Sequence, residues 1–325
     1  MNRSAFLAVL VGLFVCAFAS TASEPEIAWE SSEWNGVQRV FGVYAPAEMV
    51  DPAPIVFLLH GGGGSAEKTW NQEHGRSWRE LSDAYGFLLV LPEGRADPDN
   101  PDGHHWNDCR VEIESEDVRS SEDDVGFIVA LIDEVSRGLP IDRDRVYATG
   151  ASNGGMMTYR LAIEAGEHFA AVAAVIANLP DPTECDTAPA PIPILIMNGT
   201  EDPLMPFDGG CVASDACERG RVLSTSETVA FWVDVNGTST TPDVEKLPNR
   251  SWSDGSRVTV YTFEGESAGN DVVYYRVQGG GHTVPGFEST SLLRRAVAGS
   301  KNRDIDGPTE IWAFFRGHLV DVSSN

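Results

Sequence analysis

The sequence is poor in basic residues, in cysteine and in long apolar runs. It has 23 Lys and Arg against 49 Asp and Glu, so its formal net charge is −26 at pH 7. A surface this acidic repels nucleic acid and anionic membranes, and we expect neither as a partner. Beyond the N-terminal segment no apolar stretch is long enough to cross a bilayer, which excludes an ordinary membrane-spanning protein.

The one long apolar run lies near the N-terminus. It spans residues 5–19, follows Arg3 and is succeeded by small residues. The run is too short for a bilayer, and the small residues suit a signal peptidase. We therefore predict a cleaved signal peptide at 1–22, a single catalytic domain at 23–325, and secretion into the periplasm or the medium. Cys16 raises a lipoprotein alternative, but Val15 stands where a small residue is needed.

Only four cysteines remain after residue 22: Cys109, Cys185, Cys211 and Cys217. An even number in an exported chain predicts two disulfides. Cys211 and Cys217 enclose a short loop and are expected to pair, which leaves Cys109 for Cys185. No cysteine pair has the spacing of a zinc site, so we expect no metal.

Short apolar runs alternate with amphipathic stretches along the chain. The runs predict strands at 55–59, 87–91, 145–149, 169–176, 192–197, 258–263 and 272–277. Helices are expected at 124–138, 154–165, 225–235 and 310–319. Continuous apolar strands are typical of a parallel sheet that is buried on both faces. The alternation predicts a doubly wound, mostly parallel α/β fold in one domain.

The pentapeptide GASNG (150–154) lies between an expected strand and an expected helix. In α/β-hydrolases the nucleophilic serine sits on such a sharp turn, and flanking glycines let the backbone close. The N-terminus of the following helix stabilises negative charge that develops there. Ser152 is therefore predicted to be the nucleophile. The alternative is a glycine-rich turn that holds an ordinary serine.

A second glycine-rich segment, HGGGG (60–64), directly follows the strand expected at 55–59. Backbone N–H groups aimed at a tetrahedral oxyanion stabilise acyl transfer. We expect one donor from Asn153 and the other from Gly61 or Gly62. A phosphate-binding loop would need Lys and Ser or Thr at a spacing that this segment lacks.

The candidate acid lies in NGTEDP (198–203), after the strand expected at 192–197. Asp202 occupies the place of the triad acid on a loop after a late strand. Glu201 and Asp208 are the alternatives.

The candidate base lies in GGGHTVPG (279–286), after the last expected strand. His282 follows Ser152 and Asp202 in the chain, and this Ser, Asp, His order is that of α/β-hydrolases.

Seven stretches resemble the secreted polyhydroxybutyrate depolymerase and feruloyl esterase family of α/β-hydrolases. They are LLHGGGGSA (58–66), DDVGFIVALIDEV (123–135), ATGASNGGMMTYRLA (148–162), NGTEDPLMPFDGG (198–210), RGRVLSTSETVAFW (219–232), GGGHTVPG (279–286) and IWAFFRGH (311–318). The resemblance implies hydrolysis of carboxylic esters without a cofactor. It supports Ser152, Asp202 and His282 as the catalytic triad.

Two departures from that family bear on the substrate. Members often carry Trp before the proline of the histidine loop, where this chain has Val284. Polymer-degrading members carry a linker and a further substrate-binding domain, for which we expect no counterpart after the closing helix, so action on soluble esters or oligomers is better supported than action on insoluble polyester. Trp106 is the candidate aromatic wall, because a Cys109–Cys185 bridge would anchor its loop. Plant cell-wall aromatic esters and polyester-derived hydroxyalkanoate oligomers both remain open.

Two other functions use the same residues differently. An acyltransferase would pass the acyl group from Ser152 to a bound alcohol instead of to water. A non-catalytic binding protein on a hydrolase scaffold usually lacks a member of the triad, and here all three candidates are present.

Overall fold

The computed structural model describes residues 26–98, 100–111, 113–114, 120–185, 189–265, 269–289 and 291–319. The signal peptide predicted at 1–22 lies outside the described residues. Within the described part of the chain, no helix combines the length and the apolar character that a membrane span requires.

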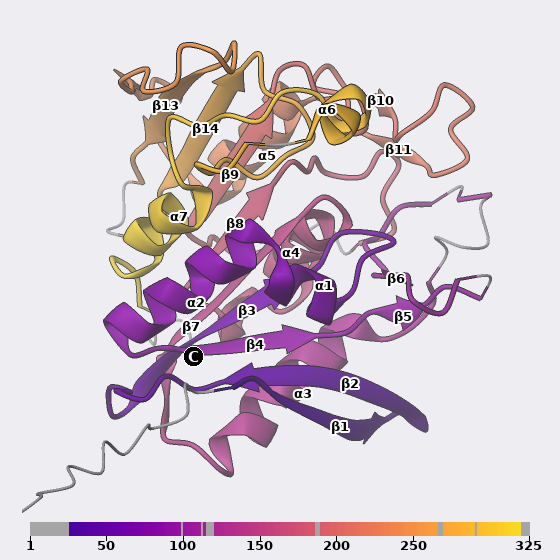
Figure 1. The fold of residues 1–325 in the computed structure, drawn as a ribbon, viewed down its shortest axis with the longest axis vertical. Coiled ribbons are helices and arrows are strands. Elements are labelled where there is room, and N and C mark those ends of the chain that lie inside the picture. The colour runs from indigo at the N-terminus through magenta and orange to yellow at the C-terminus, as the bar shows by residue number, and fades with distance from the viewer. Residues whose placement is uncertain are drawn as a thin grey trace, which may run out of the picture.

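A ten-stranded sheet runs through the molecule in the order β1-β2-β4-β3-β7-β8-β9-β14-β13-β12 (Figure 1). The strands are β1 Ala28–Trp34, β2 Val37–Tyr44, β3 Ala53–Leu59, β4 Leu88–Pro92, β7 Ile141–Ala151, β8 Ala171–Val175, β9 Ile194–Gly199, β12 Asp243–Lys246, β13 Arg257–Phe263 and β14 Val272–Gln278. Strands β4 to β14 in this order pair in parallel, and the strands at both edges pair antiparallel. The predicted mostly parallel α/β fold is therefore confirmed.

Helices cover both faces of this sheet (Figure 1). Helices α3 Asp124–Ser136, α4 Asn153–Glu164 and α5 Thr225–Asn236 bury their apolar residues in one core, and α1 Ala66–Asn71, α2 Glu73–Tyr85 and α7 Gly307–Phe315 bury theirs in the other. The remaining elements are short: β5 Arg95–Ala96, β6 His104–His105, β10 Gly210–Cys211, β11 Arg221–Val222, α6 Leu292–Ala298 and the 3-10 turn Gly166–His168.

Strand β3 shows why the apolar runs form the centre of the sheet. All seven of its residues are buried. Ile55 and Phe57 belong to the core under α3, α4 and α5, whereas Val56 and Leu58 belong to the core under α2 and α7. Successive side chains of a strand point to opposite faces, so only a continuous apolar run satisfies both layers.

Helix α7 carries a large part of the second core. Trp312 is 5% exposed, and its ring centroid lies 4.1 Å from that of Phe87. We expect Trp312→Ala to lower the free energy of unfolding by about 3–5 kcal/mol, because the cavity cannot collapse fully. Chemical denaturation monitored by circular dichroism measures this loss.

The matched control is Trp252→Ala, since Trp252 is 79% exposed. It should change the free energy of unfolding by less than about 1 kcal/mol. Equal losses in the two variants would contradict the assignment of α7 to the core.

Candidate active site

The turn between β7 and α4 holds Ser152 in an unusual backbone conformation. Its φ is +58° and its ψ is −123°. The Ser152 N–H donates to the carbonyl of Val175 at 2.9 Å, which ties the turn to β8. A non-glycine residue with positive φ costs free energy, and such residues gather at functional sites. The sequence-predicted nucleophile is thus the one strained residue of its turn.

Close backbone packing explains the two glycines around Ser152. A Cβ built on Gly150 would lie 2.4 Å from the carbonyl oxygen of Gly154. A Cβ built on Gly154 would lie 2.5 Å from the carbonyl oxygens of both Leu59 and His60. No side chain fits either space, so the turn can press against the end of β3 only with glycine at these positions.

The loop after β3 is held by the ring of His60. The N–H of Gly94 donates to Nε2 of His60 at 3.0 Å, and this bond requires the ring proton on Nδ1, although Glu93 Oε1 also lies 3.1 Å from Nε2. Nδ1 then donates to the carbonyl of Gly61 at 2.9 Å, which also accepts from Gly64 N–H at 3.0 Å. Because a trans peptide points its N–H away from its carbonyl, the Gly62 N–H faces away from these partners.

The structure corrects the expectation for Trp106, which does not line the substrate pocket. It is 1% exposed, and its ring lies 4.7 Å from the ring of His60. The Trp106 backbone N–H donates to Asn153 Oδ1 at 2.8 Å, and the indole N–H donates to the His60 carbonyl at 2.9 Å. Trp106 therefore joins the serine turn to the glycine loop by hydrogen bonds. Its ring is buried, so a substrate cannot contact it.

Asn153 is also fixed by a buried ion pair that sequence analysis did not find. Its Nδ2 donates to Asp108 Oδ2 at 2.6 Å, and Arg110 Nη2 donates to the same oxygen at 2.9 Å. The side chains of Asp108 and Arg110 are 0% and 3% exposed. Asp108 lies 45 positions before Asn153 in the chain. No local pattern signals this contact, because only the fold brings the two segments together.

Asp202 and His282 meet directly. His282 Nδ1 lies 2.8 Å from Asp202 Oδ2, and the other carboxylate oxygen accepts the backbone N–H groups of Leu204 and Met205 at 2.8 Å each. The Asp202 side chain is 2% exposed. The alternative carboxylates, Glu201 and Asp208, are exposed. Asp202 is therefore the carboxylate whose geometry can orient the imidazole.

The loops that carry these two residues interlock through their backbones. The Glu201 N–H donates to the Gly280 carbonyl at 2.9 Å, and the His282 N–H donates to the Ala298 carbonyl at 2.6 Å. A Cβ on Gly199 would lie 2.3 Å from the oxygen of Gly280. Glycine at position 199 thus allows the two loops to touch.

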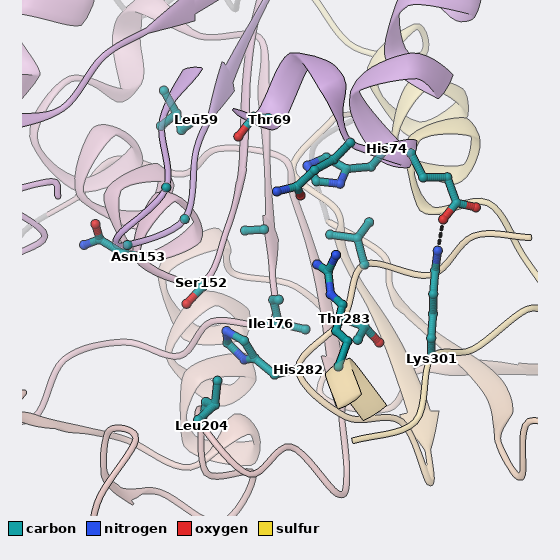
Figure 2. A pocket seen from close by; sticks show the side chains of 18 of the residues that line it. Leu59, Thr69, His74, Ser152, Asn153, Ile176, Leu204, His282, Thr283 and Lys301 are labelled. Carbon is teal, nitrogen blue, oxygen red and sulfur yellow. Dashed lines mark hydrogen bonds and ion pairs between the residues drawn. The ribbon is translucent and has the colours of Figure 1, made fainter. Parts of the chain in front are cut away.

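A pocket of about 550 Å³ opens over these residues, and Ser152, His282, Gly61, Gly62 and Val284 line it. Figure 2 shows Ser152 and His282 as neighbours on one side and Lys301 on the other. The apolar part of the lining is aliphatic: Leu59, Met156, Ile176, Leu204, Val212 and Val284. Among the lining residues that the structure describes, none is Phe, Tyr or Trp. The aromatic wall considered from the sequence is therefore not formed by the described lining.

The opposite part of the pocket is polar and charged. Gln72, Glu73, His74, Arg76, Glu288, Arg294 and Lys301 line it. Arg110 and Arg219 also line the pocket, but Arg110 lies beside Asn153, because Asp108 binds both side chains. Burial, together with the positive charges of Arg294 and Arg76, lowers the pKa of His74 from 6.5 to about 4. His74 is therefore a neutral imidazole at pH 7. Sequence analysis did not predict this wall.

Two disulfides join Cys109 to Cys185 and Cys211 to Cys217, the pairings expected from the sequence. One group of possible metal ligands is found in the described part of the chain: Cys109, Cys185 and Glu164. Since both sulfurs are consumed in a disulfide, this group offers no thiolate, and we assign it no metal.

The chain is similar to several known proteins. The family model described as phospholipase/carboxylesterase matches residues 43–219, more than half of the chain. A protein of Nocardia uniformis subsp. tsuyamanensis that carries the name esterase NocK is 36% identical over 80% of this chain and 73% of its own length. Feruloyl esterase C of Emericella nidulans is 28% identical over 65% of this chain and 73% of its own. The solved structure of acetyl xylan esterase from Aspergillus awamori shares the fold, with a TM-score of 0.56, 17% identity, and coverage of 88% of this chain and 98% of that one.

The lowered pKa of His74 predicts an effect of acid on stability. Between the ordinary pKa of 6.5 and the folded value of about 4, the unfolded chain binds a proton that the folded chain does not. The stability that a neutral His74 contributes is therefore lost as the pH falls through this window. We expect His74→Gln to lose less free energy of unfolding than the wild type between pH 7 and pH 4.5, measured by chemical denaturation.

The matched control is His168→Gln, because the side chain of His168 is 45% exposed. This variant should follow the wild type over the same pH range. A His74→Gln variant that loses stability in parallel with the wild type would refute the effect.

Proposed function

The chain is an esterase and belongs to the phospholipase/carboxylesterase family of α/β-hydrolases, and on this premise we propose that it hydrolyses carboxylic esters through a Ser152–His282–Asp202 triad. The observation that carries the proposal is the 2.8 Å contact between His282 Nδ1 and Asp202 Oδ2, on a ring that lines the same pocket as Ser152.

Acylation begins when Ser152 Oγ attacks the carbonyl carbon of the ester. His282 takes the hydroxyl proton on Nε2, because Nδ1 carries the hydrogen donated to Asp202. The carboxylate of Asp202 stabilises the imidazolium that forms. His282 then gives its proton to the leaving alcohol, and an acyl group stays on Ser152. Attack by water, with His282 again as base, releases the acid and restores Ser152.

The tetrahedral oxyanion of both steps rests on two backbone donors. One is the N–H of Asn153 at the start of α4, where the positive end of the helix dipole adds to the effect. The other is the N–H of Gly62, which faces away from the His60 side of its loop. The hydrogen bonds of the Asn153 side chain with Trp106 and Asp108 support this arrangement, because they fix the residue whose backbone N–H would bind the oxyanion.

The aliphatic lining favours an aliphatic acyl group over an aromatic one. Ile176, Leu204 and Met156 offer methylene and methyl surface to the acyl chain. An aromatic acyl group would gain less here, because ring stacking supplies much of its specific attraction. Short-chain and hydroxyalkanoate esters are therefore the proposed substrates, ahead of feruloyl esters.

Secretion is proposed on two features. Residues 1–22 have the pattern of a signal peptide, and the folded chain contains two disulfides, which persist in oxidising compartments. The periplasm or the medium would provide such conditions. The presence of mature protein in culture supernatant or periplasmic extract, with an N-terminus near residue 23, tests this proposal.

Transfer to an alcohol is the competing outcome at the same acyl-enzyme. Addition of butanol to the assay separates the two, because a transferase would form the butyl ester at the expense of the free acid. We expect the free acid to remain the main product.

Substitution of the triad tests the mechanism. Ser152→Ala should lower kcat for 4-nitrophenyl butyrate by about 10⁴-fold or more, and Asp202→Asn by about 10³- to 10⁴-fold, because the imidazole then loses its orienting charge. Asp208→Asn is the matched control, and it should stay within about twofold of the wild type. If the Asp202→Asn variant keeps its activity and the Asp208→Asn variant loses it, Asp208 and not Asp202 is the acid of the triad.

Two esters that share the 4-nitrophenyl leaving group and differ only in the acyl group test the preference of the acyl pocket. We expect kcat/KM for 4-nitrophenyl butyrate to exceed that for 4-nitrophenyl ferulate by about tenfold or more, since the described lining has no aromatic ring. The initial rate of nitrophenolate release at several substrate concentrations gives both constants. A preference for the ferulate would refute the aliphatic assignment and leave the triad intact.

A further inference from the structure

The active-site pocket reverses the charge balance of the molecule. The whole chain has 49 acidic residues against 23 Lys and Arg. Among the described residues that line the pocket, five are Lys or Arg and two are acidic. Such a local concentration of one sign in a cleft attracts ligands of the other sign. The excess of basic residues in the pocket is therefore opposite to the acidic excess of the whole chain.

Most of these cations are neutralised by a neighbour. Arg76 pairs with Glu288 at 2.6 Å, and Lys301 pairs with Glu73. Arg110 pairs with the buried carboxylate of Asp108. These three contribute hydrogen-bonding capacity to the wall but little net charge.

Arg294 differs from them. It lies on α6, it is exposed, and no ion pair of its guanidinium is found among the described residues. Its charge nevertheless reaches the pocket, because it opposes protonation of His74 on the facing helix α2. An arginine with a free fork of donors beside a pocket is suited to a carboxylate, which it can bind in a bidentate manner.

The two ends of the pocket have different chemistry. Figure 2 shows Ile176 and Leu204 near Ser152 and His282, with His74 and Lys301 on the far side. An ester that fills the pocket therefore places apolar carbon beside the scissile bond and a polar group away from it. A neutral polar group would leave the charge of Arg294 without a partner.

We propose that the enzyme prefers esters that carry a free carboxylate several atoms from the scissile bond, with Arg294 as the residue that binds this carboxylate. This inference rests on the proposed esterase function and adds a substrate class to it. The reaction itself is unchanged: water cleaves the ester, and the second carboxylate takes no part in bond making.

Two matched pairs of substrates isolate the charge. The first pair is mono-4-nitrophenyl adipate and its neutral 5-carbamoyl analogue, which place the charge on the acyl side. The second pair is 6-(butanoyloxy)hexanoate and 6-(butanoyloxy)hexanamide, which place it on the alcohol side. Carboxylate and amide have the same shape, so each ratio of kcat/KM reports the charge alone.

The wild type should prefer the carboxylate in at least one pair, and 0.5 M NaCl should weaken this preference, because salt screens exposed charges. Arg294→Gln should lower kcat/KM for that carboxylate about tenfold, the size expected for a charge-assisted hydrogen bond, and should leave the amide within about twofold. Arg295→Gln is the control. Arg295 is the neighbouring residue of α6, bonds to Ser300 and is not among the residues that line the pocket.

Each outcome decides between the claims. Hydrolysis of all four esters with no preference for the carboxylate, or with equal effects of Arg294→Gln and Arg295→Gln, overturns the inference and leaves the esterase function standing. If the wild type cleaves none of the four esters, nor 4-nitrophenyl butyrate, the proposed function fails and the inference fails with it.

Discussion

The close approach of the Ser152 turn to the end of β3 is the constraint on which the site depends. The backbone of Gly154 lies so near the carbonyls of Leu59 and His60 that a Cβ has no room. This approach brings the first turn of α4 beside the glycine loop. Two sets of N–H groups from distant parts of the chain can then face one point, which is the requirement for stabilising an oxyanion. The positive φ of Ser152 is the cost of this arrangement.

Buried polar side chains hold the arrangement together. Trp106 bonds to both Asn153 and the His60 carbonyl, and Asp108 bonds to Asn153 from the other side. Buried polar groups are expensive unless paired, so these bonds favour one geometry over its alternatives. The proposed triad is supported in the same way, because backbone N–H groups of Leu204 and Met205 bind one oxygen of Asp202 while the other contacts His282. Rigid support of this kind holds the reacting groups in one geometry, which lowers the entropic part of the barrier.

The chain as a whole is acidic, but the lining of the active-site pocket has more basic than acidic residues. The outside is strongly acidic, and the wall of the pocket opposite Ser152 is rich in cations. Most of those cations are paired, so the pocket presents hydrogen-bond donors more than bulk positive charge. His74 and Arg294 are the exceptions: burial and the charge of Arg294 keep His74 neutral, and no ion pair of Arg294 is found among the described residues.

The sequence alone determined the fold class and the candidate triad, because both depend on patterns within short segments of the chain. Apolar runs marked β3, β4 and β9, and glycines marked the loops of Ser152 and His282. It missed β1 and α2, whose residues are largely polar, and it missed β2, whose four last residues are all buried. The tertiary structure decided what depends on distant segments: the burial of Trp106, the Asp108–Asn153 contact and the charged wall. Such contacts join residues far apart in the chain, so no local pattern could have specified them.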